Sequence, residues 1–107
     1  MSDDSIGQET FSEEEERLLA LLETSHSFPC DFTFKLIVRS GAGVEQRLAT
    51  LLCDAVAVEE PSSGPDLRAS SAGRFVSMTL DLPMQSGADV LRIYRLIKDQ
   101  PEVISYF

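Results

Sequence analysis

The sequence predicts an α+β fold, and three observations lead to that prediction. Apolar and polar residues alternate over 32–39 and 74–82, the period of a half-buried strand. Residues 44–58, and the stretch between Ser86 and Pro101, instead place apolar residues at helical spacing. Turn-forming Gly, Pro and Ser residues separate these segments. With a short strand before residue 74 and a last one at the chain end, the order is βαββαβ.

That order folds most simply as a ferredoxin-like sandwich. Four antiparallel strands are expected in the spatial order 4-1-3-2, with two helices on one face of the sheet. The opposite face is left open in this arrangement.

The N-terminal part of the chain is acidic and is predicted to be an extension of the folded body. Residues 1–27 hold eight acids against one base, a net charge of −7 out of the total of −9. Ser12 and Glu15 have the spacing of a capping box, which predicts a short helix over about 13–23. Its leucines form one apolar stripe, so docking on the body and fraying in solution both stay open. We therefore expect an acidic extension, 1–27, flexible or a short helix, followed by one domain, 28–107.

The remaining elements follow in order along the chain. In the first strand, the side chains of Phe32, Phe34, Leu36 and Val38 point to one face of the sheet. The turn that follows this strand is Ser40-Gly41-Ala42-Gly43. The first helix of the domain runs to about Val58, and 59–65 is a loop by composition. A short polar strand is expected over 66–73, before the third strand, which ends at Pro83. Ser86 and Asp89 cap the next helix, and 102–107 is the last strand.

An interaction surface is expected on the open face of the sheet. The residues predicted to form it are Lys35, Ile37, Phe75, Ile104 and Tyr106. Apolar residues that are adjacent on neighbouring strands can form a patch, and such a patch favours a protein partner or a second copy of the chain. Pairing of two copies through an exposed strand edge, such as that of the last strand, is the other route to a homodimer.

Two stretches resemble a known family. "FPCDFTFKLIV", residues 28–38, and "SSAGRFVSMTLDL", residues 70–82, are similar to the YbeD-like family of small bacterial proteins, a domain of unknown function. The resemblance covers about 28–107 and implies a ferredoxin-like fold similar to the ACT-type regulatory domains of amino-acid metabolism. It implies no catalytic residues, because the family has no established activity.

A small-ligand site is expected at the turn after the first strand. ACT-like domains commonly receive small ligands at this position, so the resemblance implies an anionic or zwitterionic metabolite beside Arg39, Gly41 and Gly43. A dinucleotide fingerprint is not complete here, since Gln46 stands where its third glycine would be.

No catalytic residue, metal site or cofactor is predicted. Cys30, Cys53 and His26 do not have the spacing of a zinc site, and both cysteines are interpreted as structural. His26 has no acid or nucleophile at a useful offset. The chain contains no Asn, which excludes the acylphosphatase mechanism, an enzymatic alternative on this topology.

The sequence thus predicts a non-enzymatic, cytoplasmic regulatory or interaction module, and the sensing of a small metabolite is one role expected of it. A protein adaptor without a small ligand is the first alternative. RNA binding through Phe75 on the open face is the less favoured one, because the acidic balance opposes it. No membrane span is expected, since no apolar run approaches about 20 residues.

Overall fold

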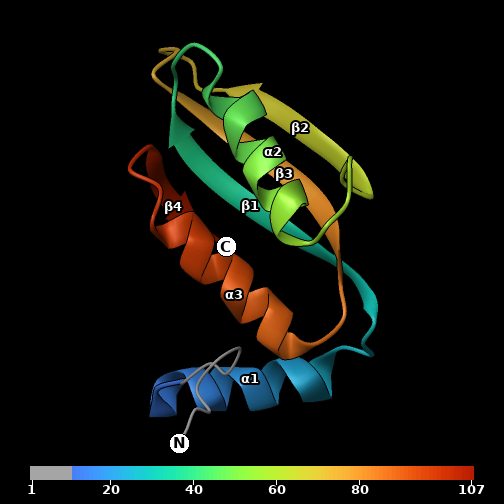
Figure 1. Ribbon diagram of the computed structural model, residues 1–107. Coiled ribbons are helices and arrows are strands. Elements are labelled where there is room, and N and C mark those ends of the chain that lie inside the picture. Colours follow the sequence, from blue (N-terminus) through green and yellow to red (C-terminus); the bar gives the residue numbers. More distant parts are fainter. Residues whose placement is uncertain (1–10) are drawn as a thin grey trace, which may run out of the picture.

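The computed structural model describes residues 11–107, which form one four-stranded antiparallel sheet and three helices. The elements are α1 (Glu13–Ser25), β1 (Cys30–Arg39), α2 (Val44–Ala55), β2 (Ser63–Ala69), β3 (Phe75–Met84), α3 (Gly87–Lys98) and β4 (Val103–Tyr106). The strand order is β2-β3-β1-β4, which is the predicted order 4-1-3-2 counted from the other edge. Figure 1 shows α2 and α3 on the same side of the sheet. None of the described helices is long and apolar enough to cross a membrane.

The core lies between the sheet and the two helices that cover it. β1 and β3 pair without interruption from Cys30↔Met84 to Arg39↔Phe75, so their buried side chains share one face. The fully buried residues of the two strands are Phe34, Leu36, Val38, Met78, Leu80, Leu82 and Met84. From the helices, Leu48 and Leu52 of α2 and Val90 and Ile97 of α3 complete this core.

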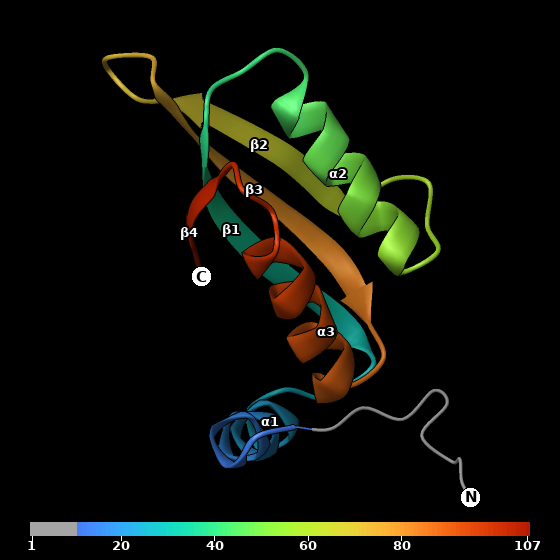
Figure 2. The ribbon, with the colours of Figure 1, turned by 60° about the vertical axis from the view of Figure 1, so that its left-hand side comes forward.

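Side-chain caps begin α1 and α3 as the sequence predicts. Ser12 and Glu15 form a reciprocal capping box: the Ser12 N–H donates to Glu15 Oε1 at 3.0 Å, and the Glu15 N–H donates to Ser12 Oγ at 3.1 Å. At α3, the Ser86 hydroxyl accepts from the Asp89 N–H at 3.2 Å. Figure 2 shows α1 beside the start of α3 rather than apart from the body.

The prediction that the first helix of the domain reaches Val58 is wrong, because α2 ends at Ala55. Ala57 has a φ of +59°, and the Val58 N–H donates back to the Cys53 carbonyl oxygen at 3.0 Å. This is the Schellman pattern of helix termination, in which glycine usually takes the left-handed position. An alanine in that position gives the sequence no stop signal.

The third strand continues through Pro83, where the sequence predicts its end. The Asp81 carbonyl oxygen accepts from Ser62 on the β2 side, so the backbone of Pro83, two residues later, faces that same side. The β2 ladder ends at Ser63, opposite Asp81, so no residue of β2 lies opposite Pro83. The missing N–H of Pro83 therefore costs no hydrogen bond between the strands.

The predicted loop over 59–65 is also too long, because β2 begins at Ser63 rather than Asp66. The register with β3 shifts between these two residues, and Gly64 and Pro65 take up the shift.

Gly64→Ala is expected to lower the free energy of unfolding by about 2 kcal/mol more than Gly73→Ala does. Both glycines have a positive φ, +88° and +74°, so both substitutions carry left-handed strain. An added Cβ at Gly64 would lie 2.6 Å from the Thr79 carbonyl oxygen, whereas nothing lies within 4 Å of that atom at Gly73. Urea unfolding of the two variants measures the difference, and equal losses would contradict the role of this close approach.

Candidate functional site

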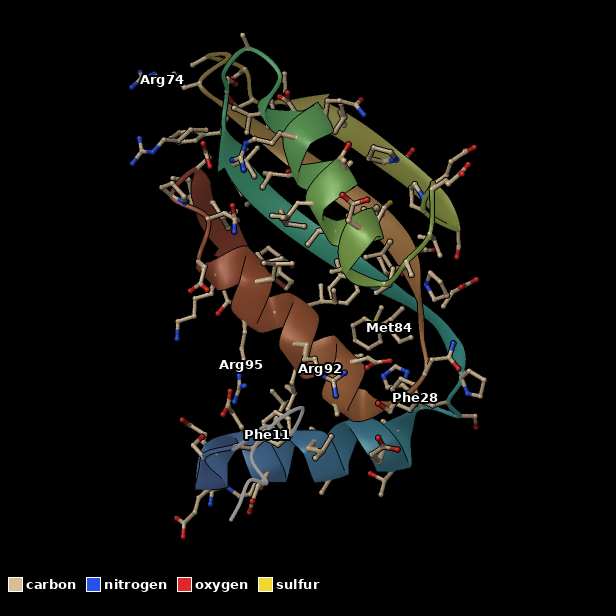
Figure 3. The ribbon with its side chains drawn as sticks, viewed as in Figure 1. Phe11, Phe28, Arg74, Met84, Arg92 and Arg95 are labelled. Carbon is tan, nitrogen blue, oxygen red and sulfur yellow. The ribbon has the colours of Figure 1, made fainter. Side chains whose placement is uncertain are left out.

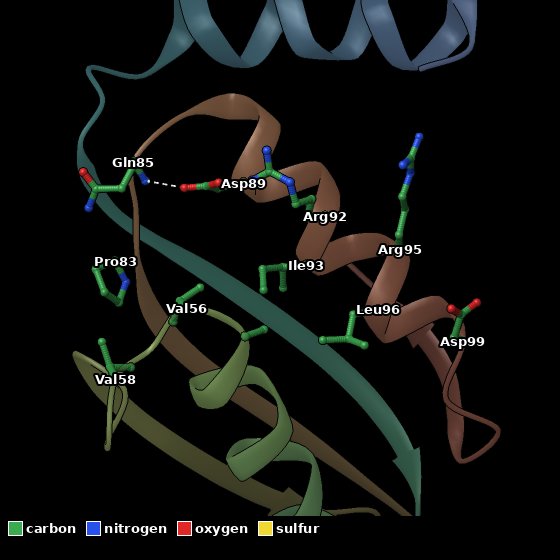
Figure 4. A pocket seen from close by; sticks show the side chains of 11 residues that line it. Val56, Val58, Pro83, Gln85, Asp89, Arg92, Ile93, Arg95, Leu96 and Asp99 are labelled. Carbon is green, nitrogen blue, oxygen red and sulfur yellow. Dashed lines mark hydrogen bonds and ion pairs between the residues drawn. The ribbon is translucent and has the colours of Figure 1, made fainter. Parts of the chain in front are cut away.

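A cleft lies between the C-terminal end of α2 and α3 (Figure 4). Its volume is about 500 Å³, and small-molecule sites commonly measure about 300–1,000 Å³. Val56, Val58, Ile93 and Leu96 supply apolar lining, and Asp89, Arg92, Arg95 and Asp99 supply charges. The cleft therefore suits a small, mainly apolar ligand with a polar end.

Several of these charges are already paired within the protein. The Asp89 carboxylate accepts from the Gln85 backbone N–H at 3.0 Å and also pairs with Arg92. Arg95 points out of the cleft toward α1 (Figure 4) and donates to the Glu15 carboxylate at 2.9 Å. The lining holds no Ser, Cys or His, so it offers no nucleophile with a neighbouring base.

Arg95 also fixes α1 to the body. Its guanidinium carbon lies 4.8 Å from the centre of the Phe11 ring, and both residues lie where α3 meets α1 (Figure 3). The hydrogen bonds from Arg95, and then from the Ser12 backbone, lower the pKa of Glu15 from 4.5 to about 2. At the other end of the contact, the Gly87 N–H donates to Glu23 Oε2 at 2.6 Å. In the structure α1 is therefore docked on the body, and its own residue Leu22 is buried.

The open side of the sheet carries a second candidate site, which we call the open face. The β-ladders place side chains on it in rows across the strands. One row holds Arg39 and Phe75; the next holds Arg68, Ser77, Ile37 and Ser105; the third holds Asp66, Thr79, Lys35 and Phe107. A trough of about 870 Å³ crosses the second and third rows.

Unpaired cations are concentrated on this side of the protein. Of the helix cations, Arg47, Arg92 and Arg95 form ion pairs with Glu102, Asp89 and Glu15 respectively, whereas Arg17 and Lys98 form none with residues 11–107. The cations of the open face and of the adjoining β2–β3 turn form none with any residue in 11–107: they are Lys35, Arg39, Arg68 and Arg74. Three carboxylates share the face, Asp31, Asp66 and Asp81, and two of them accept hydrogen bonds from Ser62 and Thr33. The end of the face near the β2–β3 turn is thus basic in a protein that is acidic overall.

The structure separates the residues of the predicted small-ligand site. Gly41 and Gly43 are exposed just before α2, and Gly43, with a φ of +74°, occupies the N-cap position. Arg39 pairs with Phe75 on the open face, whereas α2 covers the opposite face. The ligand role of these residues stays a prediction, and Arg39 belongs by position to the open face.

The prediction that Tyr106 lies on the open face is wrong. Tyr106 pairs with Leu36, a core residue, and its ring centre lies 5.6 Å from that of Tyr94 on α3. A register shift in the β1–β4 ladder leaves Ile104 without a partner. The extra residue reverses the alternation of the strand, so Phe107, opposite Lys35, takes the place on the open face that Tyr106 was expected to fill. Lys35, Ile37 and Phe75 lie there as predicted, and Ile104 is 46% exposed.

The cysteines and the histidine lie apart from both sites. Cys53 is 3% exposed in the core, and burial, followed by the charges of Asp54 and Glu60, raises the pKa of its thiol. Cys30 is partly exposed at the start of β1. His26 packs its ring 5.1 Å from that of Phe32. Among residues 11–107 there is no group of three or more His, Cys, Asp or Glu side chains that could hold a metal ion.

Four residues in the three rows of the open face were not predicted from the sequence, and Arg68 and Phe107 are the two among them that matter for binding: the others are Asp66 and Ser105. Arg68 belongs to a strand that was predicted only as short and polar. Arg68 and Asp66 are two residues apart, and this spacing in a strand already placed both side chains on the same face of the sheet. Phe107 was hidden by the register shift in β4, which no residue type in that strand signals.

Comparison with known proteins identifies one family. A family model described as "Protein of unknown function (DUF493)" matches residues 23–107, from the last turn of α1 to the final residue. The match confirms the resemblance to the YbeD-like family inferred from the sequence. Neither a curated protein nor a solved structure matches the chain.

Cys53 is expected to react with an alkylating reagent at least about tenfold more slowly than Cys30 in the folded protein. Burial limits access to Cys53 and raises the pKa of its thiol, whereas Cys30 is partly exposed. Mass spectrometry of timed, quenched samples measures both rates, and denaturant should bring them together. Rapid labelling of Cys53 without denaturant would show that its burial is wrong.

Lowering the pH from 4.5 toward 2 is expected to weaken the packing of α1 on α3. The folded pKa of Glu15 lies below its ordinary value, so its contribution is complete above pH 4.5 and is lost as the pH falls toward about 2. Glu15→Gln should weaken the packing of α1 on α3 already at neutral pH, measured by the NMR shift of the Gly87 amide. Glu16→Gln is the matched control, since Glu16 is exposed on the same helix, and an equal effect of both changes would contradict the role of Arg95.

Proposed function

The chain belongs to the DUF493 family of unknown function, and we propose that it is a non-enzymatic interaction module that binds a protein partner through the open face. The strand order, with α2 and α3 on one side, supports a ferredoxin-like architecture similar to that of ACT-type regulatory domains. Because one fold serves many functions, the proposal depends on the surface and not on the fold.

The observation that supports it is the composition of the uncovered side of the sheet. Phe75 and Phe107 are 37% and 63% exposed there, beside the unpaired cations Arg39, Lys35 and Arg68. Aromatic and arginine side chains are enriched where proteins bind one another and supply much of the binding energy. A sheet face that only met water would not need two exposed phenylalanines among its polar residues.

The chemistry of the cleft supports a non-enzymatic role. Asp89 is engaged by Gln85 and Arg92, and Arg95 by Glu15, so these charges already have partners. A general acid or base has to be free to exchange a proton with a substrate. We place the protein in the cytoplasm, where the free thiols of Cys30 and Cys53 agree with a reducing environment.

Metabolite sensing in the cleft is the second candidate. The volume of about 500 Å³ and the apolar lining by Val56, Ile93 and Leu96 favour it. Such a ligand would contact α2 and α3 together and would stabilise their packing on the sheet.

Site-specific photo-crosslinking in cells tests the interaction module. A photoreactive amino acid at Ser77, in the trough, is expected to form an adduct with a protein partner. The same amino acid at Thr50, exposed on α2 and outside the cleft, is the matched control and should form none. No adduct at Ser77, or equal adducts at both positions, would contradict the proposal.

Thermal unfolding against a panel of amino acids, nucleotides and cofactor precursors tests the second candidate. A compound that binds only the folded protein, present at a hundred times its Kd, adds about 2.7 kcal/mol and raises Tm by several degrees. Leu96→Trp, which fills the cleft, should remove such a shift, and Thr50→Trp should keep it. A shift that survives Leu96→Trp would place the ligand elsewhere.

A further inference from the structure

The distribution of charge in this chain has two extremes. The residues before Arg17 include seven acids and no base: Asp3, Asp4, Glu9, Glu13, Glu14, Glu15 and Glu16. At the other extreme, Lys35, Arg39, Arg68 and Arg74 lie on or beside the open face without an ion pair among residues 11–107. The chain therefore contains both an anionic segment and, at the end of the open face near the β2–β3 turn, a group of unpaired cations.

The trough on the open face has the donors that a carboxylate needs. Lys35 and Arg68 stand on either side of it, with the hydroxyls of Ser77 and Thr79 on the strand between them, and these two cations outnumber the one carboxylate of the lining, Asp66. Arginine and lysine form charge-assisted hydrogen bonds with carboxylates, about twice as strong as neutral ones. Ile37 and Phe107 add apolar surface beside these donors. An acidic segment that also carries an apolar side chain would match both parts.

We propose that the N-terminal segment of a second copy, residues 1–10, binds this trough, and that the exchange is reciprocal in a two-fold dimer. The segment contains Asp3, Asp4 and Glu9 together with Ile6, which fits the cations and the apolar margin. In a two-fold dimer each copy gives its segment and receives the other, so every contact forms twice. The inference rests on the proposed function, because it names the partner of the open face.

The positions of the two parts favour exchange between copies over binding within one copy. Figure 3 shows Phe11, which follows the segment, and Arg74, which lies in the β2–β3 turn at the basic end of the open face, at opposite ends of the molecule. Phe107, at the other end of the trough, lines a pocket together with Glu14 and Glu15 of α1, so it is the basic end of the face that a segment of the same copy would have to reach. In addition, α1 packs on α3, on the helix side of the sheet, so a segment of the same copy would have to pass around the body. Ten residues span at most about 36 Å when fully extended.

Three variants with defined charge separate this contact from general electrostatic repulsion. The first, Asp3→Lys with Asp4→Lys and Glu9→Lys, changes the net charge from −9 to −3. The matched control, Asp54→Lys with Glu59→Lys and Glu60→Lys, makes the same change at exposed residues away from the open face. The third reverses the surface, with Arg39→Glu, Arg68→Glu and Arg74→Glu.

Sedimentation equilibrium of each variant measures the dimer Kd. The segment variant should dimerise at least about tenfold more weakly than the wild type, although its lower net charge reduces repulsion. The control should dimerise at least as tightly as the wild type. The surface variant alone should be monomeric, and mixing it with the segment variant should restore a 1:1 dimer, because both contacts then join opposite charges again. Circular dichroism confirms that each variant is folded.

Several outcomes would overturn the inference. They are a wild type that stays monomeric at every concentration, a segment variant that dimerises as tightly as the control, and a mixture that does not associate. A monomeric wild type that binds a polyuridine oligonucleotide through Arg39 and Arg68 would assign the surface to nucleic acid instead. A monomeric wild type with Ser77 crosslinks to a different protein would overturn this inference and leave the proposed function standing.

Discussion

The antiparallel pairing of β1 with β3 is the constraint on which the rest of the structure depends. Both strands are ten residues long, and their register runs unbroken from Cys30↔Met84 to Arg39↔Phe75. Successive side chains point to opposite faces, so this single register decides which residues enter the core and which reach the open face. The helices α2 and α3 cover the first face, while β2 and the chain end after β4 widen the sheet and add Arg68 and Phe107 to the open face. Core and proposed binding surface are therefore two sides of one strand pair.

The parts of the fold that could be predicted from the sequence are those in which residue type and backbone agree. Alternation is clear in the two central strands, and Ser12 and Ser86 cap their helices through their own side chains. The predictions were wrong where the backbone departs from regular helix or strand geometry and no residue typical of that departure, such as glycine, marks the place in the sequence. Ala57 ends α2 in a conformation usually taken by glycine, and the unpaired Ile104 shifts β4 by one position. A shift of one residue exchanges the two faces of a strand, which is why Tyr106 was misplaced.

The candidate sites could be predicted only in part, because their chemistry depends on contacts between distant parts of the chain. Lys35, Ile37 and Phe75 were found from the alternation of their own strands. The cleft between α2 and α3 has no sequence signature, since its lining comes from segments that only the fold brings together. Whether a cation is paired is also a tertiary property: Arg95 meets Glu15, eighty residues earlier in the chain, and Arg39 meets no acid in 11–107. The sequence by itself does not distinguish the paired arginine from the unpaired one.

The irregular start of β2 has a consequence for how the protein avoids uncontrolled association. As an edge strand, β2 would otherwise present a continuous row of N–H and C=O groups to any extended chain, which is the usual route to strand addition and fibrous aggregates. Pro65 has no N–H to donate, and the register shifts between Ser63 and Asp66. Asp66 and Arg68 also place two charged side chains on this short strand. Together these features make the strand a poor template, so the irregular start of β2 also protects this edge of the sheet from the addition of further strands.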